Sequence, residues 1–298
     1  MKHTISDLRQ KQSLDLPSKV RMTLNRIRQW YEHWDGQVYV AFSGGKDSLV
    51  LLHLVRSIYP DAIGVFCNTG LEYPEILEFV RTIPNIAWLK PAMPFKEVLE
   101  KYGFPVVSKR TAQMIHELQT TKSEGLRTLR LTGLHPRSGK THPAGKVPAK
   151  WMFLKDAPFP ISASCCDVMK KRPSKKFEKE SGLRVMTGRM CDDSFQRQQA
   201  WAQQGCNAFE ASRPHAEPLS FWLETDIWDY IRSEKLLYSK IYDMGYDRTG
   251  CMFCMFGCHM EKGLNRFQRM KKSHPKHHAA CRKMGIETAC NFIGVPFE

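Results

Sequence analysis

Hydrophobic residues in the first third of the chain alternate between helical and strand spacing. Over residues 18–34 an apolar side chain recurs every three or four positions, at Val20, Leu24, Ile27, Tyr31 and Trp34. This spacing predicts an amphipathic helix. Strand-like runs follow at 37–42, 62–67 and 86–89, and helical patterns come after them, beyond residue 45 and at 75–81 and 95–101. The alternation predicts an α/β fold, with a parallel sheet covered by helices on both faces.

The pattern is less regular in the rest of the chain. Residues 133–148 are polar and rich in Gly, Pro, His and Lys, which predicts a loop. Strand character returns at 184–187. A helix is expected from Ser194, as its N-cap, to Gly205, and Thr225 is expected to cap another helix.

Beyond Tyr242 the apolar periodicity is too weak to predict a separate core. This segment is instead rich in Cys, Gly, Lys and His. We therefore expect three consecutive parts: an N-terminal helical segment over 1–36, a nucleotide-binding α/β domain over 37–240, and a Cys-rich basic segment over 241–298.

Composition places the chain among cytoplasmic globular proteins. Of its 298 residues, 42% are hydrophobic and 25% charged, and no apolar run reaches the roughly 20 residues of a membrane span. The first residues lack the apolar core of a signal peptide. The formal net charge of +15 indicates either a polyanionic partner or a solvated basic surface, and charge alone does not choose between them.

A phosphate-binding turn is predicted where the first strand ends and the next helix begins. Glycines there allow a tight turn and a close approach of backbone N–H groups to an anion, and the helix N-terminus adds further donors. Two serine hydroxyls and a lysine can supplement them. The residues of this loop are Ser43, Gly44, Gly45, Lys46, Asp47 and Ser48.

The loop is not a Walker A sequence and resembles the Ser-Gly-Gly-Lys-Asp-Ser signature of the PP-loop ATP pyrophosphatases and the phosphoadenylyl-sulfate reductases. The resemblance implies a doubly wound parallel sheet with the nucleotide above the C-terminal ends of the strands. Segments 68–75, 187–197 and 218–228 look like further motifs of that family. Carried over onto them, ATP contacts are expected at the loop residues, at Thr69 and at Gly188, and neutralisation of phosphate charge at Lys46, Arg189 and Arg197. Asp47 is the expected ligand of Mg²⁺.

Clustered cysteines indicate a metal site. In a reducing compartment, Cys165-Cys166 and the pair Cys251 and Cys254 can bind zinc or an iron–sulfur cluster, although a site without metal stays open. Adjacent cysteines are unusual for structural zinc, and the pairing is similar to that of the [4Fe-4S] cluster in the iron–sulfur reductases. Cys258 is an alternate ligand, since a set of Cys251, Cys254 and Cys258 would leave one iron open.

The family pattern breaks near the C-terminus. Sulfonucleotide reductases carry a catalytic cysteine in a Glu-Cys-Gly-Leu-His segment, and neither Cys281 nor Cys290 stands in one. Residues 262–283 are instead basic and contain no Asp or Glu. Such a segment suits a phosphate backbone, or it is a solvated tail.

Three functions are consistent with these features. The first is an adenylylating sulfurtransferase that uses ATP, Mg²⁺ and a [4Fe-4S] cluster on nucleic acid, either DNA or tRNA, with sulfur supplied by a protein such as a cysteine desulfurase. The second is a phosphoadenylyl-sulfate or adenylyl-sulfate reductase. The third is a non-enzymatic sensor that binds nucleotide and a cluster. No membrane partner is expected.

Overall fold

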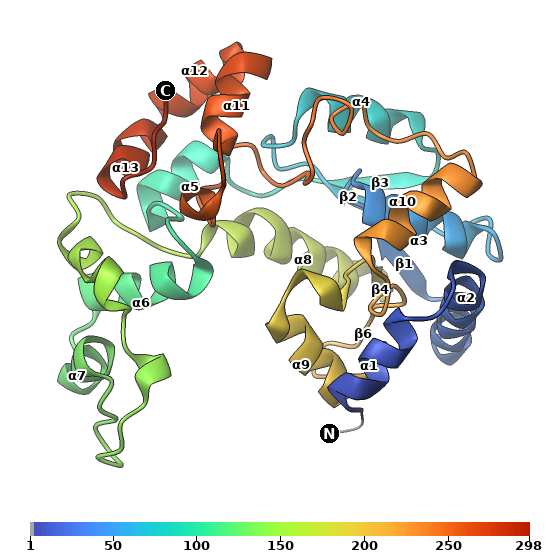
Figure 1. The fold of residues 1–298 in the computed structure, drawn as a ribbon, viewed down its shortest axis with the longest axis horizontal. Helices are drawn as coiled ribbons and strands as arrows, with labels where there is room; N and C mark the ends of the chain where they lie inside the picture. Colours follow the sequence, from blue (N-terminus) through green and yellow to red (C-terminus); the bar gives the residue numbers. More distant parts are fainter. Residues whose placement is uncertain (1–2) are drawn as a thin grey trace. The chain divides into compact units, whose positions relative to one another are not determined.

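The computed structural model describes residues 3–298, and contacts along the chain divide it into two compact units (Figure 1). Each unit is assembled from three separate stretches. Unit 1 consists of Met1–Asn68, Glu72–Lys90 and Pro173–Thr249. Unit 2 consists of Thr69–Leu71, Pro91–Arg172 and Gly250–Glu298. The three consecutive parts expected from the sequence are a different kind of division, and their boundaries stay predictions.

Unit 1 is built on a six-stranded sheet with the strand order β3-β2-β1-β4-β6-β5. The strands are β1 (Val38–Ala41), β2 (Gly64–Cys67), β3 (Ile86–Leu89), β4 (Arg184–Thr187), β5 (Asn207–Ala208) and β6 (His215–Ala216). Neighbouring strands pair in parallel, except β5 and β6, which are antiparallel. The predicted α/β class with a doubly wound, mostly parallel sheet is confirmed.

Helices flank the central strands of unit 1 on both sides. α3 (Lys46–Arg56) packs on β1 and against α2 (Leu16–His33) and α10 (Glu224–Ser233). On the face that carries Tyr39, Val65 and Val185, the covering side chain is Phe177 of α8 (Arg172–Ser181). Figure 1 shows α8 and the α3–α10 pair on opposite sides of β1 and β4. The other helices are α1 (Ile5–Gln12), α4 (Pro74–Thr82) and α9 (Phe195–Gln204).

One of the two predicted helix caps in unit 1 is confirmed and the other is wrong. Ser194 caps α9 through a hydrogen bond from the Arg197 amide, and the helix ends at Gly205. Thr225, however, lies inside α10, whose N-cap is Leu223. The carboxylate of Asp226, three residues into the helix, accepts the Leu223 amide at 2.7 Å, as the acidic residue of a capping box does.

Unit 2 is helical and includes a folded C-terminus. Its helices are α5 (Phe95–Tyr102), α6 (Lys109–Thr120), α7 (Glu124–Thr132), α11 (Arg266–Ser273), α12 (Pro275–Lys283) and α13 (Ile286–Phe292). Short turns η1 (Pro143–Gly145), η2 (Ala149–Asp156), η3 (Asp167–Lys171) and η5 (Cys258–Met260) join them, and η4 (Cys191–Asp193) belongs to unit 1. Phe267, Met270, Ile286 and Cys290 are buried there, within a unit that the segment from Gly250 shares with Pro91–Arg172, so the expectation of no separate core beyond Tyr242 stays a prediction.

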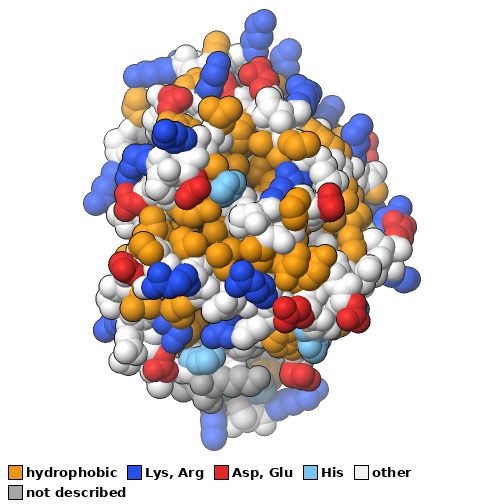
Figure 2. Space-filling view, turned by 90° about the vertical axis from the view of Figure 1, so that its right-hand side faces the viewer, with side chains coloured by type: hydrophobic (Ala, Val, Ile, Leu, Met, Phe, Trp, Pro, Cys, Tyr) orange, Lys and Arg blue, Asp and Glu red, His pale blue; other side chains and the backbone are white. Residues whose placement is uncertain are grey.

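Charge is divided very unevenly between the two units. Unit 2 contains 23 Lys and Arg against 9 Asp and Glu, whereas unit 1 contains 22 against 21. Nearly the whole net charge of +15 therefore belongs to unit 2. On the face seen in Figure 2, basic and acidic side chains are interspersed with hydrophobic ones. Among residues 3–298, no helix is long and apolar enough to cross a membrane.

Candidate nucleotide and metal sites

The predicted phosphate loop lies between β1 and α3 in unit 1. Gly45 is the N-cap of α3, so the backbone N–H groups that follow it point out of the helix N-terminus. Gly44 adopts a left-handed conformation with φ of 73°. A Cβ atom at Gly44 would lie 2.8 Å from methyl groups of Ile76 and Val80, so only glycine fits between the loop and α4.

The two serines of the loop hold its shape in this state. The Ser48 hydroxyl accepts a hydrogen bond from the Ser43 amide at 3.1 Å and donates to the Gly45 carbonyl at 2.8 Å. The Ser43 hydroxyl accepts from the Gly45 amide at 3.3 Å. The turn is therefore preorganised by its own side chains before any ligand binds.

Lys46 is the buried cation of the site. Its Nζ lies 3.1 Å from a carboxylate oxygen of Asp47 and 3.2 Å from one of Glu224, and the residue is 6% exposed. Burial lowers the pKa of Lys46, but the Asp47 and Glu224 carboxylates outweigh it and the pKa is raised. Burial raises the pKa of Asp47, with Lys46 acting in the opposite direction. An anion entering the loop would compete with these carboxylates for the ammonium.

Residues distant in sequence complete the loop. The Lys46 amide donates to the Tyr242 hydroxyl at 2.8 Å across 196 positions of chain. A Cβ at Gly45 would lie 2.5 Å from the Thr249 hydroxyl, which therefore packs directly on the loop. Tyr242, Thr249 and Glu224 carry no motif that would have marked them in the sequence.

Of the other residues predicted to bind nucleotide, Gly188 packs near the loop, and the rest have polar partners of their own. Gly188 packs on the start of α3, since a Cβ there would lie 2.8 Å from the Asp47 carbonyl oxygen. Arg189 pairs with Glu217 at 2.6 Å, and Arg197 pairs with Asp193 and donates to the Met190 carbonyl at 3.3 Å. Thr69 belongs to unit 2, where its hydroxyl accepts the Leu71 amide at 3.3 Å.

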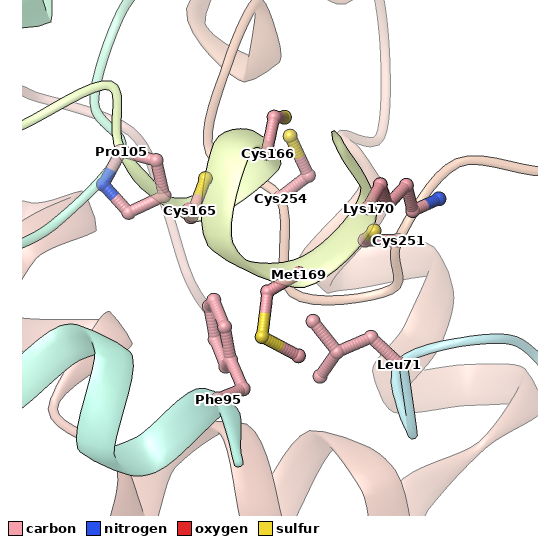
Figure 3. Close-up of a pocket in the computed structure, with 9 residues that line it drawn as sticks. All are labelled: Leu71, Phe95, Pro105, Cys165, Cys166, Met169, Lys170, Cys251 and Cys254. Atoms are coloured by element: carbon pink, nitrogen blue, oxygen red, sulfur yellow. The ribbon is translucent and has the colours of Figure 1, made fainter. Parts of the chain in front are cut away.

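The predicted metal ligands line one pocket of unit 2 (Figure 3). Cys165, Cys166, Cys251 and Cys254 surround it together with apolar side chains and Lys170. Figure 3 shows the sulfur atoms of Cys166 and Cys254 directed toward each other. The pocket has a volume of about 20 Å³, enough for about one water molecule. Among the described residues, no three His, Cys, Asp or Glu side chains are close enough to hold one metal ion.

Electrostatics favours a thiolate in this pocket. The hydrogen bond from Cys165 lowers the pKa of Cys166, and Lys109 and Lys170 act in the same direction, while the pKa of Cys165 is raised by the same hydrogen bond. Burial raises the pKa of Cys254. Cys258 is not among the residues found to line the pocket; its thiol donates to the Met255 carbonyl at 2.9 Å.

A comparison with protein families matches the phosphoadenosine phosphosulfate reductase domain over residues 37–90 and 95–256. The chain belongs to this family. The match contains the loop, the Gly188 turn and all four pocket cysteines, and it confirms the resemblance drawn from the sequence. The basic helices α11 to α13 lie C-terminal to the residues that match the family.

Curated relatives are distant. The uncharacterized proteins MJ0066 and MJ0973 of Methanocaldococcus jannaschii are 27% and 24% identical over 86% of this chain, which spans 43% and 50% of their lengths. The chain thus spans about half the length of these two relatives. An adenosine 5'-phosphosulfate reductase of Staphylococcus epidermidis is 22% identical over 81% of this chain and 79% of its own.

Two solved structures are similar at a low level. A phosphoadenylyl-sulfate reductase from Candida auris has 17% identity and a TM-score of 0.46, covering 80% of this chain and 96% of its own. The U34-tRNA thiolase NcsA from Methanococcus maripaludis, with its [4Fe-4S] cluster, has 15% identity and a TM-score of 0.39. The match covers 92% of this chain and 80% of the thiolase.

Proposed function

We propose that the protein is an ATP-dependent, adenylylating sulfurtransferase that acts on nucleic acid, in DNA phosphorothioation or tRNA thiolation. The observation that carries this proposal is the preorganised loop at the N-terminus of α3, with a buried lysine in it. A helix N-terminus with a lysine suits the pyrophosphate of ATP, whose oxygens would replace the present acceptors of the loop's N–H groups. Membership of a family that includes nucleotide-using enzymes supports an enzymatic role.

The loop would act by position and charge. An oxygen of the acceptor attacks the α-phosphorus of ATP and pyrophosphate leaves; a sulfur nucleophile then displaces AMP from the activated acceptor. Lys46 would exchange Glu224 for a phosphate oxygen, and Arg189 and Arg197 would neutralise further charge. Asp47, released by Lys46, would be free to bind Mg²⁺, directly or through water.

The donor set of the pocket in unit 2 fits an iron–sulfur cluster. A cubane is bound by one thiolate per iron, and four cysteines line this pocket. Cys165, Cys166, Cys251 and Cys254 would hold it after the pocket has widened. When bound, it would stabilise the site or offer an open iron to sulfide. The internal hydrogen bond of Cys258 supports the four-cysteine set over the alternate one.

The two C-terminal thiols count against the reductase alternative. Cys281 and Cys290 are completely buried, and burial raises the pKa of both. A buried neutral thiol is a poor nucleophile. The reductase function would therefore need another nucleophile of this chain or a thiol from a partner protein. Sulfite release from an adenylyl sulfate would establish that alternative, and absence of any nucleotide turnover would favour the sensor.

The test is anaerobic incubation of the iron-reconstituted protein with ATP, Mg²⁺ and nucleic acid. We expect pyrophosphate and AMP as products. Lys46→Ala should lower turnover at least tenfold, because a charge-assisted contact contributes about 1.5–3 kcal/mol. Lys240→Ala, at an exposed lysine of unit 1, is the matched control. Unchanged kinetics in Lys46→Ala would remove the phosphate-loop assignment.

A sulfur donor would then be identified by adding a cysteine desulfurase. Incorporation of labelled sulfur into DNA or tRNA, dependent on both ATP and the desulfurase, is the expected result. Sulfur incorporation without ATP would contradict adenylylation.

A further inference from the structure

We propose that a basic hairpin of unit 2, after α7, is a docking element for duplex DNA. The inference rests on the proposed function and deepens it, since it names one acceptor and the surface that would hold it. We call residues 121–150, which contain α7 and the hairpin, the basic arm. None of the motifs used above lies in this segment.

The basic arm and its flanks concentrate positive charge. Between residues 118 and 155 the only acidic side chain is Glu124. Eight basic ones share this stretch: Lys122, Arg127, Arg130, Arg137, Lys140, Lys146, Lys150 and Lys155. Two histidines, His135 and His142, face each other across the hairpin, with ring centroids 5.5 Å apart. A stretch of this composition is suited to contact with phosphates.

The hairpin is a short two-stranded ribbon. Leu134 and Thr141 form an antiparallel bridge, and the His142 amide donates to the Gly133 carbonyl at 2.7 Å. The turn is closed by the His135 amide, which donates to the Lys140 carbonyl at 2.9 Å. In Figure 1 the hairpin extends beyond α7, away from α6.

The base of the hairpin is anchored to the helices of unit 2. Arg130 pairs with Glu117 of α6 and donates to the Gly145 carbonyl at 2.9 Å. The Val147 amide donates to the Arg130 carbonyl at 2.9 Å, and Val147 is completely buried. The charged tip is thus presented on a fixed base, which lowers the ordering cost of binding.

Two cations at the tip, Arg137 and Lys140, and one near the base, Lys146, are not neutralised within the described part of the chain. Among residues 3–298, Arg137, Lys140 and Lys146 are exposed and have no carboxylate within ion-pair distance.

The C-terminal helices differ in this respect. Glu261, Glu287 and Glu298 pair with four of the eight basic residues of segment 262–283, namely Arg266, Arg269, Lys271 and Arg282. The arm differs from that segment in presenting its unpaired cations Arg137 and Lys140 at the turn of a hairpin, outside any helix.

Groove dimensions favour DNA over RNA. Paired strands lie about 4.8 Å apart, so a ribbon with its side chains is narrow enough for the major groove of B-DNA, about 12 Å wide. The major groove of A-form RNA is deep and narrow and excludes such an element. Arg137 and Lys140 at the tip would contact phosphates or guanine edges.

The test is a titration of duplex DNA into the full-length protein, without ATP, at several salt concentrations. Arg137→Ala with Lys140→Ala should weaken binding at least about tenfold. The slope of log K against log salt should become shallower by about 1.8, since each phosphate contact contributes about 0.9. Lys90→Ala with Lys240→Ala removes the same charge from exposed positions of unit 1 and should change neither quantity.

Three outcomes would overturn the inference: equal DNA binding by the arm variant, an equal loss in the control variant, or tighter binding of duplex RNA or tRNA than of duplex DNA. Pyrophosphate release from ATP separates this inference from the proposed function. If the arm variant loses DNA binding while the wild-type protein releases no pyrophosphate, docking stands and the sulfurtransferase proposal fails.

Discussion

The Tyr242 hydroxyl occupies a donor that a bound phosphate would need. It lies 2.8 Å from the Lys46 amide, one of the first N–H groups of α3. Lys46 itself is engaged by Asp47 and Glu224. The loop is therefore internally satisfied, with a phenol oxygen and two carboxylates at the positions of ligand oxygens. Binding of an anion becomes an exchange of partners, whose net free energy is smaller than that of filling an unpaired site.

Tyr242→Phe should accordingly strengthen binding of pyrophosphate and of ATP. Removing the competing oxygen leaves the Lys46 amide unpaired, so a neutral hydrogen bond of about 0.5–1.5 kcal/mol no longer has to be given up. We expect roughly two- to tenfold tighter binding by calorimetry. Tyr238→Phe is the control, because that hydroxyl donates to Asp243 at 3.1 Å on the surface. Weaker binding by Tyr242→Phe would mean that the hydroxyl contacts the ligand.

At the scale of helices and strands, the sequence predicted an element correctly where its residue types favour one kind of secondary structure. The runs at 86–89 and 184–187 coincide with β3 and β4, because β-branched and aromatic residues such as Ile86, Trp88 and Val185 favour strands. The sequence did not predict α12, whose buried positions are His278 and Cys281, residue types that an apolar pattern does not count. α7 has no fully buried residue at all.

One part of the candidate nucleotide site could likewise be predicted from the sequence, and the other part could not. The six contiguous loop residues could be read directly from the sequence, because one strand–turn–helix unit places them together. Tyr242 and Glu224 could not, since only the tertiary fold brings them to α3.

One buried ion pair joins α2 to α10. Lys19 and Asp226 lie 2.6 Å apart, with side chains 2% and 12% exposed. Asp226 also accepts the Leu223 amide at the start of α10. Nearby, the Trp222 indole donates to the Thr23 hydroxyl at 2.9 Å. Removing only one partner of such a pair leaves a charge that is both buried and unpaired.

Lys19→Met should therefore lower the free energy of unfolding by about 3–5 kcal/mol, measured by urea denaturation. Lys19→Met combined with Asp226→Asn should recover much of this loss, since the amide oxygen still caps α10 without a charge. Lys240→Met, at an exposed position, should change stability by less than about 0.5 kcal/mol. A double variant no better than Lys19→Met would show that the charge of Asp226 is not the cause.

At the scale of the whole molecule, the candidate nucleotide site and the candidate metal site belong to different units. The phosphate loop belongs to unit 1, which is nearly neutral, and the cysteine pocket to unit 2, which carries almost all the net charge. If both sites bind the ligands proposed for them, each ligand should be removable without the other. Loss of metal should leave the loop of unit 1 folded.

Anaerobically prepared protein should contain about four irons and four acid-labile sulfides per chain. Replacing Cys165, Cys166, Cys251 or Cys254 by Ser should remove or destabilise the cluster, while Cys67→Ser in unit 1 should not. Cys258→Ser distinguishes the two ligand sets, since it should leave iron unchanged if its thiol serves only the turn at Met255. Stoichiometric zinc without labile sulfide would contradict the assignment.

The path of the chain between the units has a consequence for biosynthesis. Unit 2 is not complete until residues 250–298 have joined residues 91–172. At about 5–20 residues per second, Cys251 leaves the ribosome roughly 4–17 s after Cys166. During that interval the first two pocket thiols have no partners from the later stretch and stay exposed to oxidants. A chaperone or cofactor-delivery factor acting on the nascent chain would meet the Cys165-Cys166 pair alone, before the pocket exists.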